Sequence, residues 1–153
     1  MSTPEERISE LGLRLPEPAA PLASYVPTRR TGNLVYTSGQ VPFVDGELRV
    51  LGKVGAEVSL EQAVEQARIC ALNCVAALKA EVGELSRVTR IVKVVGFVAS
   101  APDFYGQPQV INGASDLLGE IFGDEGKHAR SAVGVAVLPS NVPVEVELIA
   151  EVS

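Results

Sequence analysis

The chain of 153 residues lacks any run of the roughly 20 apolar residues that a membrane-spanning helix needs. Its first residues, MSTPEERISELG, are polar and acidic, without the basic segment and apolar core of a secretory signal. Positive charge is also scarce, because 13 lysines and arginines stand against 19 acidic residues and the net charge is −6. We therefore expect a cytoplasmic protein whose main partner is not a nucleic acid, since phosphate backbones repel an acidic surface.

Residues that bind metals or build catalytic triads are equally scarce. The chain has two cysteines, Cys70 and Cys74, and one histidine, His128. The cysteines are four residues apart in a helical pattern, so we expect buried, reduced thiols rather than metal ligands. A lone histidine forms neither a metal site nor a Ser-His-Asp triad without partners. Phosphate-binding glycine loops, zinc motifs and EF-hands are also missing, so the sequence implies no metal and no cofactor.

What is present is the composition of a folded protein. Hydrophobic residues make up 46% of the chain and charged residues 21%, which suits one globular domain with one core. We expect residues 1–153 to form that single domain. Residues 1–18 form an N-terminal extension in which a short helix covers residues 5–11 and prolines follow.

Two longer helices are predicted from apolar periodicity. Residues 60–82 repeat apolar side chains at helical spacing, with Ser59 and Gln62 positioned as a capping box and Gly83 at the stop. Residues 108–122 repeat the pattern, with a proline in the first turn and Gly123 after the last.

The remaining apolar segments predict a sheet. We expect strands over residues 23–26, 34–37, 48–51, 90–100, 131–138 and 144–152, with turns at 31–33, 45–46 and 139–141. The order of elements predicts an α+β fold, a mixed sheet with two helices on one face. The strands are apolar on both sides and no third long helix is predicted. A second copy of the chain is the simplest cover for the other face, which predicts a homo-oligomer.

Two charged residues carry the candidate chemistry. Arg130 begins an apolar strand, and its guanidinium is a planar fork that matches a carboxylate. Glu145 opens the last strand on the face opposite its apolar residues, where it could orient or deprotonate a water molecule. On neighbouring strands, the pair could hold a small carboxylated molecule and a water together. Both patterns equally fit solvated side chains at strand ends.

Three further residues have two readings each. His128 is either a loop residue making a hydrogen bond or part of a pocket beside Arg130. Tyr25 either packs or reaches a pocket from the end of its strand. Gly39 interrupts an apolar strand, which indicates a bulge or the close approach of another group to the backbone.

Three segments together resemble one known family. Residues 35–42 (VYTSGQVP), 130–139 (RSAVGVAVLP) and 145–150 (EVELIA) are similar to the RidA/YjgF family of reactive-intermediate deaminases, also labelled endoribonuclease L-PSP. The resemblance covers about residues 20–152. Residues 52–55 and 128–134 resemble a longer subgroup of that family.

The resemblance implies a chorismate-mutase-like fold and a homotrimer whose sheets form a central barrel, with three ligand clefts between subunits. It implies hydrolysis of enamines and imines such as 2-aminoacrylate to 2-keto acids and ammonia. By the same resemblance Arg130 grips the substrate carboxylate and Glu145 helps hold the attacking water. The other cleft residues that it implies are Tyr25, Ser38, Gly39, Asn112 and Ala132.

The chain departs from the family pattern at three places, one of which is residues 23–25, where Ala-Ser-Tyr replaces the Gly-Pro-Tyr run and makes the Tyr25 match looser. Ala132 stands where many active members have a cysteine, and His128 stands where a proline usually precedes the Ala-Arg pair. The loss of the thiol favours an alternative, a cleft that binds small carboxylates without turnover. RNA cleavage, named in the older family label, is disfavoured by the acidic charge and by the lack of a histidine-based acid–base pair.

Overall fold

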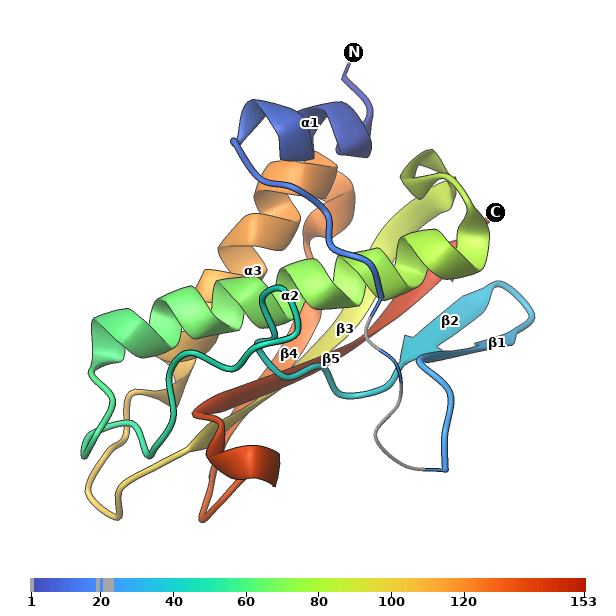
Figure 1. Ribbon diagram of the computed structural model, residues 1–153. Coiled ribbons are helices and arrows are strands. Elements are labelled where there is room, and N and C mark those ends of the chain that lie inside the picture. The colour runs from blue at the N-terminus through green and yellow to red at the C-terminus, as the bar shows by residue number, and fades with distance from the viewer. Residues whose placement is uncertain (1, 19, 21–23) are drawn as a thin grey trace.

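The structure is a computed structural model and describes residues 2–18, 20 and 24–153. Two long α-helices lie against a five-stranded sheet, and a short third helix, α1, packs on the end of α3 (Figure 1). The elements are α1 (Pro4–Glu10), β1 (Thr28–Thr31), β2 (Leu34–Thr37), α2 (Leu60–Val82), β3 (Val88–Ala99), α3 (Gln107–Phe122), β4 (Ala129–Val135) and β5 (Val144–Val152). Single 3-10 turns lie at Leu85–Arg87, Gly123–Gly126 and Pro139–Asn141. None of the described helices is long and apolar enough to cross a bilayer.

The strands follow the order β1-β2-β5-β3-β4. β3 and β4 are parallel, and every other pair of neighbours is antiparallel. The two long helices pack on each other and on one face of this sheet, α2 over β5 and α3 over β3 and β4 (Figure 1). The predicted α+β class, with a mixed sheet and two helices on one face, is confirmed.

Local capping sets the ends of α2. The Ser59 hydroxyl accepts a hydrogen bond from the Gln62 backbone N–H at 3.1 Å, and the Gln62 side chain accepts one from the Ser59 N–H at 2.9 Å. Gly83 ends the helix at φ 88°, a backbone angle that favours glycine. The predicted capping box and stop are therefore confirmed at the residues named.

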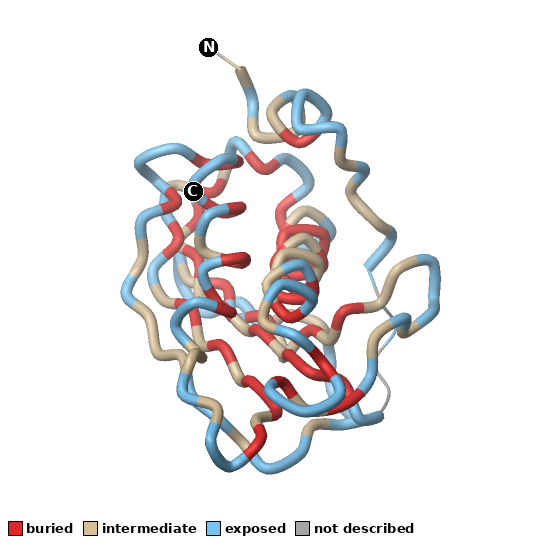
Figure 2. Tube along the Cα trace, turned by 90° about the vertical axis from the view of Figure 1, so that its left-hand side faces the viewer, coloured by how far each residue is buried: buried red, intermediate tan, exposed pale blue. Residues whose placement is uncertain are grey.

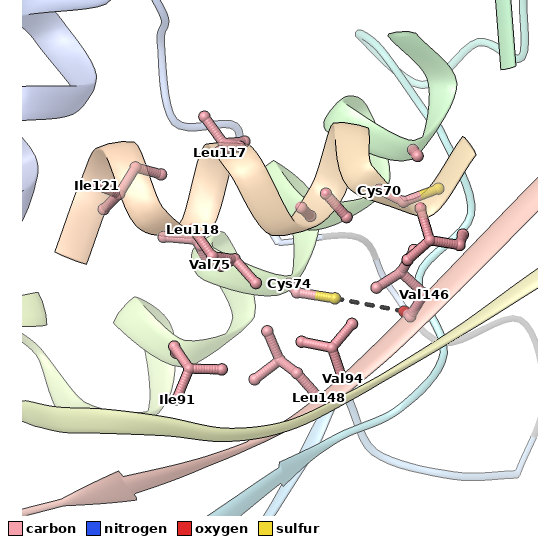
Figure 3. Packing of buried hydrophobic residues seen from close by; sticks show 14 of the residues in the cluster. Cys70, Cys74, Val75, Ile91, Val94, Leu117, Leu118, Ile121, Val146 and Leu148 are labelled. Atoms are coloured by element: carbon pink, nitrogen blue, oxygen red, sulfur yellow. Dashed lines mark hydrogen bonds between the residues drawn. The ribbon is translucent and has the colours of Figure 1, made fainter. Parts of the chain in front are cut away.

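The core lies between the helices and the sheet, where buried residues gather in Figure 2. Figure 3 shows Cys70 and Cys74 of α2 reaching toward β5. The Cys70 thiol donates to the Val144 carbonyl at 3.5 Å and the Cys74 thiol to the Val146 carbonyl at 3.3 Å. Burial raises the pKa of Cys74 to about 12, so the thiol keeps its proton. The expectation of buried, reduced thiols is confirmed.

The N-terminal helix is fastened to the ends of both long helices. The Lys79 ammonium of α2 donates to Glu5 Oε2 at 2.8 Å, and Arg7 Nη1 donates to the Ile121 carbonyl of α3 at 3.0 Å. The N-terminal extension therefore packs against the ends of α2 and α3.

Three predicted strands differ from the structure. Of residues 23–26, Ala23 lies outside the described residues, Ser24 and Tyr25 form a bend and Val26 is irregular, so the first strand begins after Pro27. Residues 48–51 form no strand, because the turn at Asp45 and Gly46 is closed by a single bridge between Val44 and Glu47. The strand predicted over residues 131–138 is β4, shifted toward the N-terminus by its parallel pairing with β3.

The face of the sheet opposite the helices carries no other element of the described chain. On β5, buried and partly exposed residues alternate over the whole strand. Partly exposed apolar side chains on neighbouring strands share this open face, among them Tyr36, Phe97, Val133 and Ile149. Such a surface supports the expectation that a second copy of the chain covers it.

Candidate functional site

Arg130 lies on the edge strand β4 and points toward α3. Its register partner Val94 is buried beneath the helices, and so is Leu148 beyond it. Arg130 Nη1 donates to Asn112 Oδ1 at 2.7 Å and to Ser115 Oγ at 3.2 Å. Nη2 donates to the Pro108 carbonyl at 3.4 Å. One stripe of α3 therefore fixes the guanidinium.

These bonds leave part of the Arg130 fork available. They use both Nη1 hydrogens and one Nη2 hydrogen, while the Nε–H and the other Nη2–H meet no acceptor among the described residues. A guanidinium edge with two donors is the geometry that binds a carboxylate bidentately. Asn112 and Ser115 thus orient Arg130.

His128 is fixed through both ring nitrogens. Nδ1 lies 2.6 Å from the Gly126 carbonyl oxygen and Nε2 lies 2.9 Å from Ser115 Oγ. Because a carbonyl only accepts, Nδ1 carries the proton, and in the neutral ring Nε2 accepts from the Ser115 hydroxyl. That hydroxyl then presents a lone pair to Arg130. We call Asn112, Ser115, His128 and Arg130 the arginine half.

A pocket of about 330 Å³ opens beside this half. Its lining residues are Ser115, Gly119, Gly126, Lys127, His128 and Arg130. Both sequence-based readings of His128 therefore hold, because it makes hydrogen bonds and also lines a pocket.

Glu145 lies on the other face of the sheet. Its register partner Phe97 and the next residue in that row, Val133, are on the open face. Glu145 Oε2 occupies the space that a Cβ on Gly39 would need. The expected close approach of another group to the Gly39 backbone is thus confirmed. Burial, and then the charge of Glu147, raise the pKa of the Glu145 carboxyl, so its carboxylate is a stronger base than an exposed one.

Ser38 ties a preceding segment to this second cluster. Its Oγ donates to the Val26 carbonyl at 2.5 Å, and its backbone N–H donates to the Pro27 carbonyl at 2.8 Å. The hydroxyl of Ser38 therefore holds the segment next to Tyr25, whose side chain is half-exposed. We call Tyr25, Ser38, Gly39 and Glu145 the glutamate half.

The two halves do not meet within one chain. β3 lies between β4 and β5, so the prediction that Arg130 and Glu145 are on neighbouring strands is wrong. They also point to opposite faces of the sheet. β4 and β5 are consecutive in the sequence but are not neighbours in the sheet, because β4 pairs in parallel with β3 at the edge of the sheet. Ala132 lies on the arginine side and packs partly against the core.

Sequence reasoning missed Ser115, Gly119 and Lys127. Ser115 and Gly119 lie on the same stripe of α3 as Asn112, at spacings of three and four residues. That stripe interrupts the apolar pattern of the helix, and this interruption was the available signal. Within residues 2–18, 20 and 24–153 no group of three or more potential ligands could hold a metal ion.

The mixed sheet with two helices on one face defines a small α+β protein of chorismate-mutase-like architecture. The family model described as "YjgF/chorismate mutase-like, putative endoribonuclease" matches residues 5–152. The chain belongs to this YjgF family.

Relatives and solved structures agree with this assignment. Protein TCP17 of Trypanosoma cruzi is 43% identical over 147 residues, which span 95% of this chain and 92% of TCP17. A crystal structure of an Agrobacterium tumefaciens protein is 46% identical, with a TM-score of 0.93 over 98% of this chain and 92% of the other. Escherichia coli TdcF with bound serine is 30% identical, with a TM-score of 0.61 over 90% and 94% of the two chains.

Proposed function

We propose that this protein hydrolyses small carboxylated enamines and imines to 2-keto acids and ammonia. The reaction takes place, without a cofactor, in clefts that neighbouring subunits of a homotrimer build jointly. We also propose the cytoplasmic location that the sequence leads us to expect. The observation that carries it is the guanidinium of Arg130, which three hydrogen bonds hold while two of its donors remain available.

The Arg130 fork is the anchor for the substrate carboxylate. Asn112 and Ser115 accept both Nη1 hydrogens, so the remaining edge is oriented before a ligand arrives. A prearranged donor pair loses little conformational entropy on binding, which strengthens the contact. The similar protein TdcF of Escherichia coli is known with bound serine, an amino acid that carries a carboxylate.

The position of Glu145 supports a cleft built from two copies of the chain. Because Glu145 and Arg130 face opposite sides of one sheet, a ligand held by Arg130 of one chain meets the glutamate half of another. The half-exposed apolar side chains of the open face, such as Phe97 and Val133, support burial against further copies.

In the cleft, a carboxylated enamine first takes its imine form. Glu145 accepts a proton from a water whose oxygen bonds to the imine carbon, and the C=N electron pair moves to nitrogen. Nitrogen takes up that proton, giving a carbinolamine. The C–N bond then breaks as the carbonyl forms, and nitrogen leaves as ammonia with the hydroxyl proton. The raised pKa of Glu145 favours its part as proton acceptor.

The test generates 2-aminoacrylate in situ and measures 2-keto acid release above the uncatalysed rate. We expect acceleration by the native protein and loss of at least about 100-fold in kcat/KM for Arg130→Ala, because the substrate carboxylate is left unpaired. Arg49→Ala, at an exposed arginine in the loop before α2, is the matched control. Equal rates with and without protein would reject the hydrolase.

The alternative is a cleft that binds carboxylates without turnover, which Ala132 favours by removing the thiol found in many active members. Saturable binding of 2-oxobutyrate, lost in Arg130→Ala and unaccompanied by imine hydrolysis, would support that alternative.

A further inference from the structure

The pocket beside Arg130 has a second cation in its lining, Lys127, that the proposed reaction does not use. Lys127 and Arg130 line it with His128 and Ser115, and its described lining residues include no carboxylate. The chain as a whole carries a net charge of −6. A concave site with cationic walls in an acidic protein attracts an anionic ligand.

The pocket is also larger than a three-carbon substrate requires. A volume of about 330 Å³ lies within the roughly 300–1,000 Å³ of sites that take drug-sized ligands. The imine form of 2-aminoacrylate has only six non-hydrogen atoms and is smaller than such ligands. Room therefore remains on the Lys127 side once a carboxylate is held at Arg130.

Lys127 is free to engage a ligand there. Its Nζ lies 3.3 Å from Asp124 Oδ1, in an ion pair whose side chains are 82% and 93% exposed. Ion pairs between side chains this exposed are weak, so an acidic group of a ligand can replace Asp124 as the partner of Lys127. Lys127 and Arg130 line the same pocket, so a ligand with two acidic groups can contact both cations.

The pocket walls are fixed before binding. Gly126 packs against the Leu118 carbonyl, where a Cβ would collide, and its own carbonyl accepts from His128. Gly119 is different, because a Cβ built on it meets nothing within 4 Å. The open space beside Gly119 is therefore available to a ligand, and a larger side chain at this position would fill it.

We propose that the pocket between the C-terminal half of α3 and residues 126–130 binds the second acidic group of a 2-imino dicarboxylate. Lys127 pairs with that second acid while Arg130 holds the carboxylate next to the imine. This inference rests on the proposed function, because it takes Arg130 as the substrate anchor. It narrows the substrate class to imines derived from acidic amino acids.

The test compares two stable five-carbon product analogues by calorimetry. The probes are 2-oxoglutarate and 2-oxopentanoate, which differ only in whether the far end is a carboxylate or a methyl group. We expect 2-oxoglutarate to bind the native protein at least about tenfold more tightly, because a charged hydrogen bond is added. Equal affinities would overturn the inference.

Two variants locate the source of the preference. Lys127→Gln is expected to reduce the 2-oxoglutarate affinity to that of 2-oxopentanoate, while Lys53→Gln, with the same charge change outside the pocket, keeps the preference. Gly119→Leu fills the pocket and should also remove the preference. Its helical position and open surroundings allow folding, which a thermal melt checks. A preference that survives both variants would place the second acid elsewhere and overturn the inference.

Failure of the inference is distinguishable from failure of the proposed function. Equal affinities that both fall in Arg130→Ala would remove the second-acid site and keep the anchor. Affinities for both ligands that are unchanged in Arg130→Ala would overturn the proposed function itself.

Discussion

The arginine half and the glutamate half lie on opposite faces of one sheet and are built in opposite ways. Arg130 is held by Asn112, Ser115 and the Pro108 carbonyl, and Ser115 is held in turn by His128. The Glu145 carboxylate has no hydrogen-bond partner within the described part of the chain and lies against Gly39. One half is a fixed cation, whereas the other is a partly buried carboxylate with a raised pKa.

This difference matches the two tasks that the proposed reaction assigns to Arg130 and Glu145. A fixed fork suits the carboxylate of a substrate, which keeps its charge from binding to release. A carboxylate without hydrogen bonds is poised to exchange protons, because no donor stabilises its charged form. If the proposed reaction needs both halves, their placement on opposite faces means that an isolated chain has no complete site.

The largest expected effect comes from a subunit-complementation experiment, which tests whether the arginine half of one chain and the glutamate half of another form one site. Arg130→Ala and Glu145→Gln chains are each expected to be inactive, but mixing them after reversible unfolding should restore about one quarter of the native sites. Each restored site pairs an intact Arg130 with an intact Glu145 from the neighbouring chain. The measurement is imine hydrolysis per subunit. A mixture as inactive as its components would show that the halves do not cooperate across subunits.

Gly39→Ala is expected to damage only the glutamate half. The added methyl group displaces the Glu145 carboxylate, the flexible end of its side chain, and Gly39 is not in the left-handed region, so the backbone tolerates alanine. Misplacing a catalytic group by about 1 Å can reduce turnover about 100-fold. We expect that loss in kcat, with little change in KM.

A double-mutant cycle provides the control for Gly39→Ala. If the methyl group acts through Glu145, then adding Gly39→Ala to Glu145→Gln should cause little further loss. Additive losses from the two changes would contradict this interpretation.

Ser115→Ala is expected to loosen the arginine half more mildly. One hydrogen bond to Arg130 is lost and His128 Nε2 loses its partner, while Asn112 and Pro108 remain. A single hydrogen bond contributes about 0.5–1.5 kcal/mol, so KM should rise about two- to tenfold. Ser115→Thr keeps the hydroxyl and should restore the native KM in steady-state kinetics. Equal effects of alanine and threonine would show that the hydroxyl does not orient Arg130.

Sequence reasoning succeeded where the deciding interactions are local. The Ser59 and Gln62 capping box and the Gly83 stop placed α2 to the residue, because each contact spans only three or four positions. The alternation of β5 likewise placed Glu145 on the face opposite its apolar residues. The YjgF family was also recognised from short segments, and the family model confirms it.

Reasoning from the sequence failed where distant elements decide. The sequence contains no local signal that β4 pairs in parallel with β3, so β5 was expected beside β4. Ser115 was missed for the same reason, since its partners His128 and Arg130 are 13 and 15 residues away, on another element. The close approach to Gly39 was expected, but the group responsible, Glu145, emerges only from the fold.

The smallest expected effect concerns how the charge of Glu147 tunes the glutamate half. Glu145 must be ionised to accept a proton, so kcat should fall as the pH drops through its raised pKa, with a midpoint above 4.5. Glu147→Gln removes a negative charge that favours protonated Glu145, so the midpoint should move to lower pH. The midpoint for Glu147→Gln should still lie above 4.5, because burial raises the pKa of Glu145 more than the charge of Glu147 does.

The pH dependence of kcat for the native protein and the variant measures this shift. Glu151→Gln is the matched control, a carboxylate on the same face and six residues, about 20 Å, from Glu145. At that distance salt screens its charge, so its midpoint should equal the native one. An unshifted midpoint in Glu147→Gln would mean that the acid limb of the profile reports a group other than Glu145. The proton acceptor would then have to be sought in the arginine half, where the ring of His128 lines the pocket beside Arg130.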